Sequence, residues 1–528
     1  MSAPARSNPP TDRDPRAERG EWKLLPYPSQ IESVHMALLH TGKVLYFSGF
    51  RVAEAVKTET RVWYPRTGHI GAPPTPADIF CAGHSFLPDG RLLSTGGTLE
   101  YRNLPPLPPW LVRALRPIAP FIVRVFGRFV KTELAMTGPT FLYLFDPKTE
   151  QWAFAGEMEE GRWYPTNTTL PDGRILILSG SNEGGGYGSQ GRIDVNRRIE
   201  VYSAEDGLQQ VGIIPSTDPD FPSLYPRMFV LPLSGEEKRA YPAGKAFCAG
   251  EHALSKFLNL STWEWTDVAE QAFEARHHGC AVLLPLRPPD YRARVLTFGG
   301  FKEHGRDAIA TETAELIDLG RLPYAWEQID PLQDKRAHTC AVLLPDGRVL
   351  AVGGNSTGLF DTPVLNVQVF DPEEIKWRQL APMSVPRGYH STGLLLPDGR
   401  VLTAGTTPFG PYELRLEVYS PDYLFKGSRP RITRSPKSLL YQQPAEVSYE
   451  HTGGIRCVAL LRPGAVTHAF DMDQRYVELR FERSGTDRLT IEAPPDPHVA
   501  PPGFYMLFLL SEDGVPSEAT FVHLPAQT

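Results

Sequence analysis

A hairpin motif that recurs along the chain constrains its fold more than any other feature. The motif is an apolar run, a tight turn usually written Pro-Asp-Gly, a second apolar run and then small residues. Asp and Gly tolerate the positive φ angles that tight turns require, so each copy predicts a β-hairpin. Copies lie at residues 38–49, 86–97, 169–180, 229–244 (degenerate), 283–300 (with an enlarged turn), 343–354 and 395–405.

A second motif, of the form Val-Tyr-Asp-Pro-x-Thr-x-x-Trp, follows each hairpin. Hairpin and following strand alternate about every fifty residues, which is the period of a four-stranded blade of kelch type. The sequence therefore predicts an all-β fold built on a seven-bladed kelch-type β-propeller. The copies of the second motif begin at Val62, Leu144, Val201, Phe257, Leu316, Val369 and Val418.

The repeat stops near residue 425, and the remaining chain shows alternating strands. This pattern predicts a separate C-terminal immunoglobulin-like β-sandwich over residues 425–528. We expect the propeller to span residues 22–424. The polar segment 1–21 has no apolar core of the kind that a secretory signal needs, and it is predicted to form a disordered arm.

Composition argues against several classes of protein. The 54 Lys and Arg residues stand against 61 Asp and Glu, a net charge of -7, so no basic excess points to nucleic acid. No apolar stretch is long enough to span a bilayer. Five cysteines without CxxC spacing, in a chain of 528 residues, do not suggest a zinc site or a disulfide scaffold. Their odd number leaves at least one thiol unpaired or otherwise used.

One structural position recurs nine residues before the turn glycine of each clear hairpin. If the strand that follows is the innermost of its blade, the side chains at this position converge near the central axis, where pockets form. Cys, His and Tyr in one ring suit a transition metal, copper in particular. For any one position the alternative is a polar residue satisfied near the channel. The position holds Cys81, Tyr164, His338 and His390, and alignment on Pro285 adds His278.

Tyr389 and His390 are adjacent in the chain. Adjacent side chains of a regular strand point to opposite faces, so both can reach one metal only where strand pairing begins or breaks. Pro386 and Gly388, just before them, allow that irregularity.

Several segments are similar to the galactose oxidase/glyoxal oxidase family of copper-radical oxidases, and the resemblance covers residues 22–524. It implies a copper ion and a cysteine-modified tyrosine radical as the two redox centres. The segments are DIFCAGHSFLPDG (78–90), GRWYPTNTTLPDG (161–173), VPRGYHSTGLLLPDGRV (385–401), GAVTHAFDMDQR (464–475) and PPGFYMLFLLSEDGVPS (501–517).

The resemblance assigns roles residue by residue. It implies that Tyr164 is an equatorial copper ligand, joined through its ring to the sulfur of Cys81. Tyr389 would be the axial tyrosine and the base, and His390 and His468 the two imidazole ligands. His468 belongs to the C-terminal domain, which would push a loop into the channel of the propeller. For His468 alone, the alternative is a histidine of a surface turn.

The sequence departs from galactose oxidase at a residue near the radical site. Asn182 stands where galactose oxidase has a tryptophan stacked on the modified tyrosine, which puts the shielding of the radical and a hexose preference in doubt. Arg227 matches a substrate-contacting arginine of the family loosely, and a surface or salt-bridging arginine is the alternative. His278 and His338 would line the pocket or support the ligands.

An insertion at residues 99–131 carries five arginines and a terminal lysine between large apolar residues. It leaves the rim of the propeller that carries Cys81. One hypothesis is an amphipathic membrane-surface anchor over residues 105–129. We favour the alternative, a lid packed on its own propeller or on another chain.

The expected function is a copper-radical oxidase that oxidises small aldehydes or primary alcohols with O2 and releases H2O2. The alternative is a non-catalytic kelch-repeat interaction scaffold or a glycan-binding propeller. We expect a monomer that acts on a small molecule. Localisation stays open, because no export signal is visible whereas the family usually works outside the cell.

Overall fold

The structure is a computed structural model that describes residues 14–48, 58–98, 100–101, 136–182, 195–215, 221–303, 305, 307–358, 362–405 and 413–527. Apart from residues 100–101, the predicted insertion at 99–131 lies outside these ranges, and its role as a lid or membrane contact stays a prediction. Within the described part, no helix combines the length and the apolar character needed to cross a membrane.

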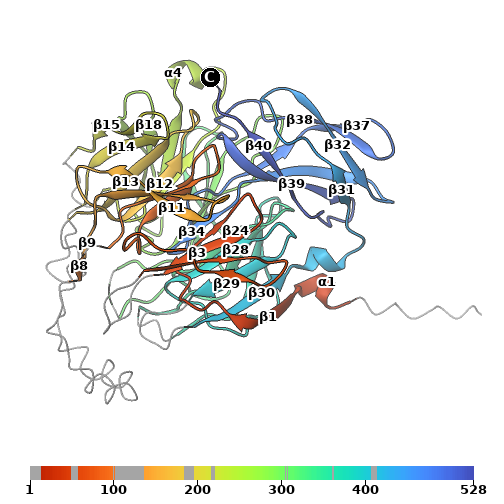
Figure 1. Cartoon of the computed structure of the whole chain (residues 1–528), viewed down its shortest axis with the longest axis horizontal. Helices are drawn as coiled ribbons and strands as arrows, with labels where there is room; N and C mark the ends of the chain where they lie inside the picture. Colours follow the sequence, from red (N-terminus) through yellow and green to blue (C-terminus); the bar gives the residue numbers. More distant parts are fainter. Residues whose placement is uncertain are drawn as a thin grey trace, which may run out of the picture.

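Seven sheets of the described chain form the blades of a β-propeller (Figure 1), which confirms the predicted fold class. The first strand of each blade is innermost, since β12 contacts β6 and β16 while β24 contacts β20 and β28. The blades are β2 (His35–Leu38), β3 (Val44–Ser48), β4 (Glu59–Trp63), β5 (Ile70–Gly71); β6 (Gly83–Phe86), β7 (Leu92–Thr95), β10 (Phe141–Asp146), β11 (Gln151–Glu157); β12 (Trp163–Thr169), β13 (Ile175–Ser181), β14 (Arg198–Ser203), β15 (Gly207–Ile213); β16 (Arg227–Val230), β17 (Lys245–Ala249), β18 (Leu254–Asn259), β19 (Trp265–Glu270); β20 (Cys280–Leu283), β21 (Arg294–Phe298), β22 (Ala314–Asp318), β23 (Trp326–Ile329); β24 (Cys340–Leu343), β25 (Val349–Val352), β26 (Gln368–Asp371), β27 (Lys376–Gln379); and β28 (Ser391–Leu395), β29 (Val401–Gly405), β30 (Arg415–Ser420) with β1 (Glu21–Pro28).

The recurring motifs occupy equivalent places in the blades. The Asp-Gly turns join the first two strands of the blades that carry them, and the second motif falls on the third strand of each blade. The turn glycines Gly90, Gly173 and Gly347 have φ angles of 87°, 89° and 86°, which explains why the turn requires glycine. Burial decreases outward, because β6 is fully buried whereas β11 is largely exposed or half-buried.

The N-terminal strand closes the ring of blades. β1 pairs with β30, with Glu21 opposite Ser420, so the last blade combines both ends of the propeller. A short helix, α1 (Arg16–Arg19), precedes it, and the Tyr419 hydroxyl donates to the Arg19 carbonyl at 2.6 Å. The prediction of a disordered arm to residue 21 is therefore wrong for residues 14–21. The exposed edge of β30 supplies the partner that orders this polar segment.

The C-terminal region forms the predicted β-sandwich, drawn in blue in Figure 1. A 3-10 helix, η1 (Asp422–Phe425), leads into it from the propeller. One sheet has the order β31-β32-β38-β37, the other β36-β33-β39-β40. Their bounds are β31 (Arg431–Arg434), β32 (Pro444–Glu450), β33 (Ile455–Leu461), β36 (Tyr476–Leu479), β37 (Phe481–Arg483), β38 (Arg488–Glu492), β39 (Gly503–Ser511) and β40 (Thr520–Leu524); outside the blades and the sandwich lie α4 (Glu237–Ala240), β8 (Glu100–Tyr101) and β9 (Met136–Thr137).

A hairpin of the C-terminal region enters the channel of the propeller. Its strands, β34 (Ala465–Thr467) and β35 (Phe470–Asp471), extend the first blade, because β34 pairs with the innermost strand β2. Thr467 lies opposite His35 in this pairing. The hairpin thus carries a loop from a different domain into the axis of the blades, as the family resemblance implies.

Buried polar groups hold this hairpin in place. The guanidinium of Arg462 donates to the Asp473 carboxylate at 2.8 Å, and both residues are buried. One oxygen of Asp471 accepts the backbone N–H groups of Ala465 at 2.9 Å and Asp473 at 3.0 Å. Burial raises the pKa of Asp471 to about 7.

This raised pKa predicts a loss of stability with rising pH. The folded chain keeps a proton on Asp471 that the unfolded chain releases above about pH 4, so stability falls from there through pH 7. Asp471→Asn keeps an oxygen acceptor and removes the charge. We expect the loss between pH 5 and pH 8 to shrink by at least about 1.4 kcal/mol, the equivalent of one pKa unit. Melting temperatures at both pH values measure it, with the exposed Asp487→Asn as control. An unchanged pH dependence would contradict the assignment.

Candidate metal centre

The residues at the recurring position lie at matching points of five blades. Each stands at or just before the start of the innermost strand, and each has the left-handed backbone conformation that non-glycine residues rarely adopt. This shared turn of the chain repeats one side-chain placement around the axis. The φ angles are 65° at Cys81, 66° at Tyr164, 57° at His278, 58° at His338 and 67° at His390.

A sixth residue at this position, Tyr225, was missed by counting back from the turn glycine. It has a φ of 48° and lies just before β16. The turn of its blade is degenerate, so the distance to the glycine is not preserved. Alignment on Pro232 would have identified Tyr225, because Pro232 follows Tyr225 by seven residues, as Pro285 follows His278.

Backbone hydrogen bonds connect this position between neighbouring blades. The N–H of Tyr164 donates to the Cys81 carbonyl at 3.0 Å, and the N–H of Tyr225 donates to the Tyr164 carbonyl at 2.9 Å. The N–H of His338 donates in the same way to the His278 carbonyl at 2.9 Å. These links hold the residues at one level of the channel.

A buried arginine two residues earlier supports the position in several blades. Arg162 is fully buried and binds Glu200 at 2.7 Å, and Arg276 binds Glu315 at 2.5 Å. The Arg276 guanidinium also donates to the Gly299 carbonyl at 3.1 Å. Each arginine ties the segment before the innermost strand to the outer strands of its own blade. The site therefore rests on the rigid interior of the blades.

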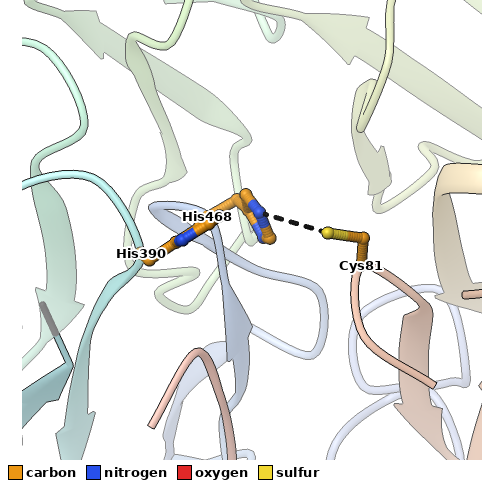
Figure 2. Close-up of side chains that lie close together, drawn as sticks. All are labelled: Cys81, His390 and His468. Carbon is orange, nitrogen blue, oxygen red and sulfur yellow. Dashed lines mark hydrogen bonds between the residues drawn. The ribbon is translucent and has the colours of Figure 1, made fainter. Parts of the chain in front are cut away.

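Cys81, His390 and His468 form the centre of the site (Figure 2). Their sulfur and nitrogen ligand atoms all lie within 4.8 Å of one another, and all three side chains are buried. The Cys81 sulfur points toward the His468 ring, with 3.9 Å between Sγ and Nε2. One residue comes from the second blade, one from the last blade and one from the C-terminal hairpin.

Two tyrosine hydroxyls meet beside this cluster. The hydroxyls of Tyr164 and Tyr389 share a hydrogen bond. The Tyr389 ring stacks on His390 with 3.9 Å between ring centroids, and the Tyr164 ring lies 4.5 Å from the His468 ring. Burial raises the pKa of the Cys81 thiol, and a side-chain hydrogen bond with Tyr164 opposes that rise. The structure thus brings together five side chains that the sequence singled out.

Hydrogen bonds determine which nitrogen of His468 is available. The Thr467 hydroxyl lies 3.1 Å from the Val34 carbonyl and 2.7 Å from Nδ1 of His468. A hydroxyl has one hydrogen, which goes to the carbonyl, so its oxygen accepts the Nδ1–H of His468. The lone pair of Nε2 then faces the cluster. Thr467 is a functional residue that motif counting could not reveal.

The imidazole of His390 has a free nitrogen as well. Its Nε2 is buried and has no hydrogen-bond partner among the described residues. Burial lowers the pKa of His390 to about 3 and that of His468 well below its usual value, so both rings are neutral. Neutral imidazoles with available lone pairs are what metal binding requires.

Removing the Thr467 hydroxyl should weaken metal binding. Thr467→Val preserves the shape of the side chain and deletes the acceptor for His468. Loss of such an outer partner of a metal-binding histidine costs about 10- to 100-fold in affinity. Copper titration with a competing chelator measures the change, and Thr467→Ser, which keeps the hydroxyl, should bind within about threefold of the parent protein. Equal affinities for all three proteins would refute this role.

Two aromatic rings cover Tyr164. Trp163 stacks on it with ring centroids 3.7 Å apart and an interplanar angle of 15°, and Tyr225 stacks at 4.5 Å and 25°. Asn182 lies half-buried directly after β13. Asn182 had put the shielding of Tyr164 by a stacked ring in doubt. Trp163 and Tyr225 provide such stacking from other positions in the chain.

The other predicted pocket residues lie on the Tyr389 side of the site. The rings of His278 and His338 are 4.4 Å apart, and the His338 ring is 4.7 Å from that of Tyr389. Nδ1 of His278 lies 3.9 Å from the carboxylate of Glu251. Their role as pocket residues stays a prediction.

Arg227 is packed into the wall of the channel. Its guanidinium donates to the Tyr225 carbonyl at 2.7 Å and to the Gly279 carbonyl at 3.3 Å. It lies 4.9 Å from the Phe470 ring and 3.9 Å from a Glu251 oxygen. These contacts favour the salt-bridging alternative, and a contact with substrate stays a prediction.

Comparisons with known proteins agree with this architecture. The family model described as "Glyoxal oxidase N-terminus" matches residues 264–423, and the model "Galactose oxidase-like, Early set domain" matches residues 429–524. A galactose oxidase of Gibberella zeae is 27% identical over 92% of this chain and 67% of the relative. Over these two regions the chain resembles the galactose oxidase/glyoxal oxidase family.

Other proteins are similar to this chain over most of their length. The aldehyde oxidase GLOX of Vitis pseudoreticulata is 28% identical to this chain over 85% of the chain and 82% of the relative. A solved structure described as a novel fungal alcohol oxidase of the AA5 family, in complex with copper, superimposes with a TM-score of 0.76. It is 24% identical and covers 96% of this chain and 100% of its own, which shows a common fold.

Proposed function

We propose that this protein is a member of the galactose oxidase/glyoxal oxidase family and a copper-radical oxidase that oxidises small aldehydes or primary alcohols with O2 and releases H2O2. The convergence of Cys81, Tyr164, Tyr389, His390 and His468 carries the proposal. These side chains come from three blades and the C-terminal hairpin. A scaffold or a glycan-binding propeller would not need buried donors of this kind from four separate places. Since one chain supplies all of them, we propose a monomer.

The donor set fits copper. Two neutral imidazoles with available nitrogen atoms and two phenol oxygens are ligands that a transition metal of borderline softness accepts. We propose His390, His468, Tyr164 and Tyr389 as the ligands. Bound copper would supply one of the two one-electron acceptors that a two-electron oxidation needs, and a modified Tyr164 the other.

We propose that Cys81 and Tyr164 form a thioether. The new bond joins Sγ to a ring carbon beside the phenol oxygen. The thiol hydrogen and the ring hydrogen leave as two protons and two electrons, which reduce one O2 to H2O2. A sulfur substituent makes a phenol easier to oxidise, so the product can store a radical. The place of both residues beside His468 supports this step, because the Cys81 sulfur lies 3.9 Å from Nε2 of His468 and the ring centroids of Tyr164 and His468 are 4.5 Å apart.

Tyr389 is the proposed base. Its oxygen receives the proton of the substrate hydroxyl, while the oxygen of the Tyr164 radical receives a hydrogen atom from the adjacent carbon. The one electron that remains on the substrate would go to the bound copper, and O2 would then take up the two electrons and two protons. The hydrogen bond between the two hydroxyls places both acceptors next to each other. In sum, a primary alcohol and O2 give an aldehyde and H2O2, and a hydrated aldehyde gives the acid in the same way.

The substrate class follows from two indications. Relatives are named galactose oxidase and aldehyde oxidase, so sugars, alcohols and aldehydes are the candidates. Asn182 stands where galactose oxidase has a tryptophan, which the resemblance implies is also absent from glyoxal-oxidase-like members, and this favours small aldehydes or primary alcohols over hexoses.

Peroxide release from the copper-loaded protein tests the proposal. A panel of small aldehydes, primary alcohols and hexoses would be assayed with a coupled peroxidase, using metal-free protein as control. We expect turnover of small aldehydes or alcohols and little turnover of hexoses. A copper-loaded protein carrying the thioether that releases no peroxide from any of them would overturn the proposed activity.

A further inference from the structure

The backbone at Cys81 and Ala82 is held from three directions. The N–H of Cys81 donates to Nε2 of His35 at 2.9 Å, and the carbonyl of Cys81 accepts the N–H of Tyr164 at 3.0 Å. The carbonyl of Ala82 accepts the hydroxyl of Tyr225 at 3.1 Å. Two of these three hydrogen bonds are made by side chains, that of His35 from the first blade and that of Tyr225 from the fourth blade. This segment therefore adopts its shape because of distant residues.

His35 is itself rigidly placed. It is fully buried in β2. Its ring stacks on Phe47 with centroids 4.4 Å apart and an interplanar angle of 7°. Through the pairing of β2 with β34 it lies opposite Thr467, next to His468. His35 thus connects the first blade to the hairpin that carries His468 through its backbone, and to the segment that carries Cys81 through its side chain.

The hydrogen bond from Cys81 to His35 has a conformational consequence. Cys81 has a φ of 65°, a conformation that a residue with a Cβ atom occupies only when its surroundings enforce it. The N–H that points to His35 is part of that backbone turn. Without the acceptor, this buried N–H would lack a hydrogen-bond partner, which costs free energy. A backbone rotation that directs the N–H to another acceptor would then be favoured. Such a turn would rotate the thiol away from Tyr164.

We propose that His35 is a positioning residue for the Cys81–Tyr164 thioether. By accepting the Cys81 N–H, it holds the thiol against the phenol ring while the bond forms. The proposal rests on the proposed function for the existence of the thioether. Its oxidant is the O2 already named, which takes up the two electrons and two protons released. Misplacing a reacting group by about 1 Å costs on the order of a hundredfold in rate, so a modest shift of Cys81 is enough.

A pair of variants separates the acceptor from the bulk of the ring. His35→Phe keeps an aromatic ring for stacking on Phe47 and removes the acceptor. His35→Gln keeps an acceptor oxygen and loses the ring. Metal-free protein would receive one equivalent of copper in air, and mass spectrometry would follow the loss of about 2 Da in peptides linking Cys81 to Tyr164. We expect His35→Phe to slow the linkage at least about tenfold and His35→Gln to stay within about threefold of the parent.

Further measurements make every outcome decisive. Melting temperature and copper affinity show whether His35→Phe is folded and binds metal. A purely structural role for His35 would lower these two quantities, whereas a positioning role would lower the linkage rate alone. If that variant does not fold, Tyr225→Phe, which keeps its ring and releases the Ala82 carbonyl, should slow the linkage in the same direction. Linkage at the parental rate in a folded variant overturns the role of His35 alone. Failure of the parent protein to link overturns the proposed function and this inference together.

Discussion

Replacing Tyr164 with phenylalanine should lower the rate of peroxide release by about a thousandfold or more, because residues that act as one unit lose most of their effect together. The substitution removes one phenol oxygen, which is a proposed ligand, a proposed radical site and the partner of the Tyr389 hydroxyl. The ring that stacks on Trp163 and Tyr225 remains. The loss should therefore reflect chemistry rather than folding.

Steady-state peroxide release at saturating substrate measures this effect. Tyr46→Phe is a matched control, because Tyr46 is also a buried propeller tyrosine whose hydroxyl donates to a carbonyl, that of Ser29, at 2.7 Å. It should retain activity within about threefold, in keeping with the small cost of one neutral hydrogen bond. A Tyr164→Phe protein with more than a tenth of the parental rate would contradict the radical mechanism.

Replacing Cys81 with serine should prevent the thioether while leaving the proposed copper ligands in place. The variant should bind copper through His390 and His468, keep its unmodified mass after exposure to copper and O2, and lose activity by roughly a hundredfold. That loss corresponds to about 2.7 kcal/mol of activation free energy. The physical reason is that an unsubstituted phenol is harder to oxidise.

Intact mass and peroxide release measure the two parts of this prediction. Cys280→Ser is the matched control, because Cys280 is equally buried, starts the innermost strand of another blade and donates to the Thr339 carbonyl at 2.7 Å. It should lose about 2 Da like the parent. A Cys81→Ser protein that shows the same mass loss would place the modification elsewhere.

Much of the fold was predictable because the blade repeats a local pattern. Asp-Gly turns and the strands beside them depend on nearby residues, so the motif marks each hairpin directly. The same regular spacing predicts, from the sequence alone, that Cys81, Tyr164 and His390 lie at one level of the channel. His468 lies outside the repeat, and only the family resemblance brought it into the site.

The remaining features depend on contacts between distant segments. The spacing rule did not identify Tyr225, because the turn of its blade is degenerate. The order of the chain at Glu21 depends on the pairing of that residue with Ser420. His35 and Thr467 act through single hydrogen bonds to Cys81 and His468. Spacing along the chain carries no information about such bonds, which require the three-dimensional arrangement.

A crystal structure of the copper-loaded protein, with an anomalous map at the copper edge, tests the central claim most directly. We predict one copper peak bound by Nε2 of His390, Nε2 of His468 and the oxygens of Tyr164 and Tyr389, with density joining the Cys81 sulfur to the Tyr164 ring. A copper peak away from these side chains, or a sulfur clearly separate from the ring in active protein, would contradict it.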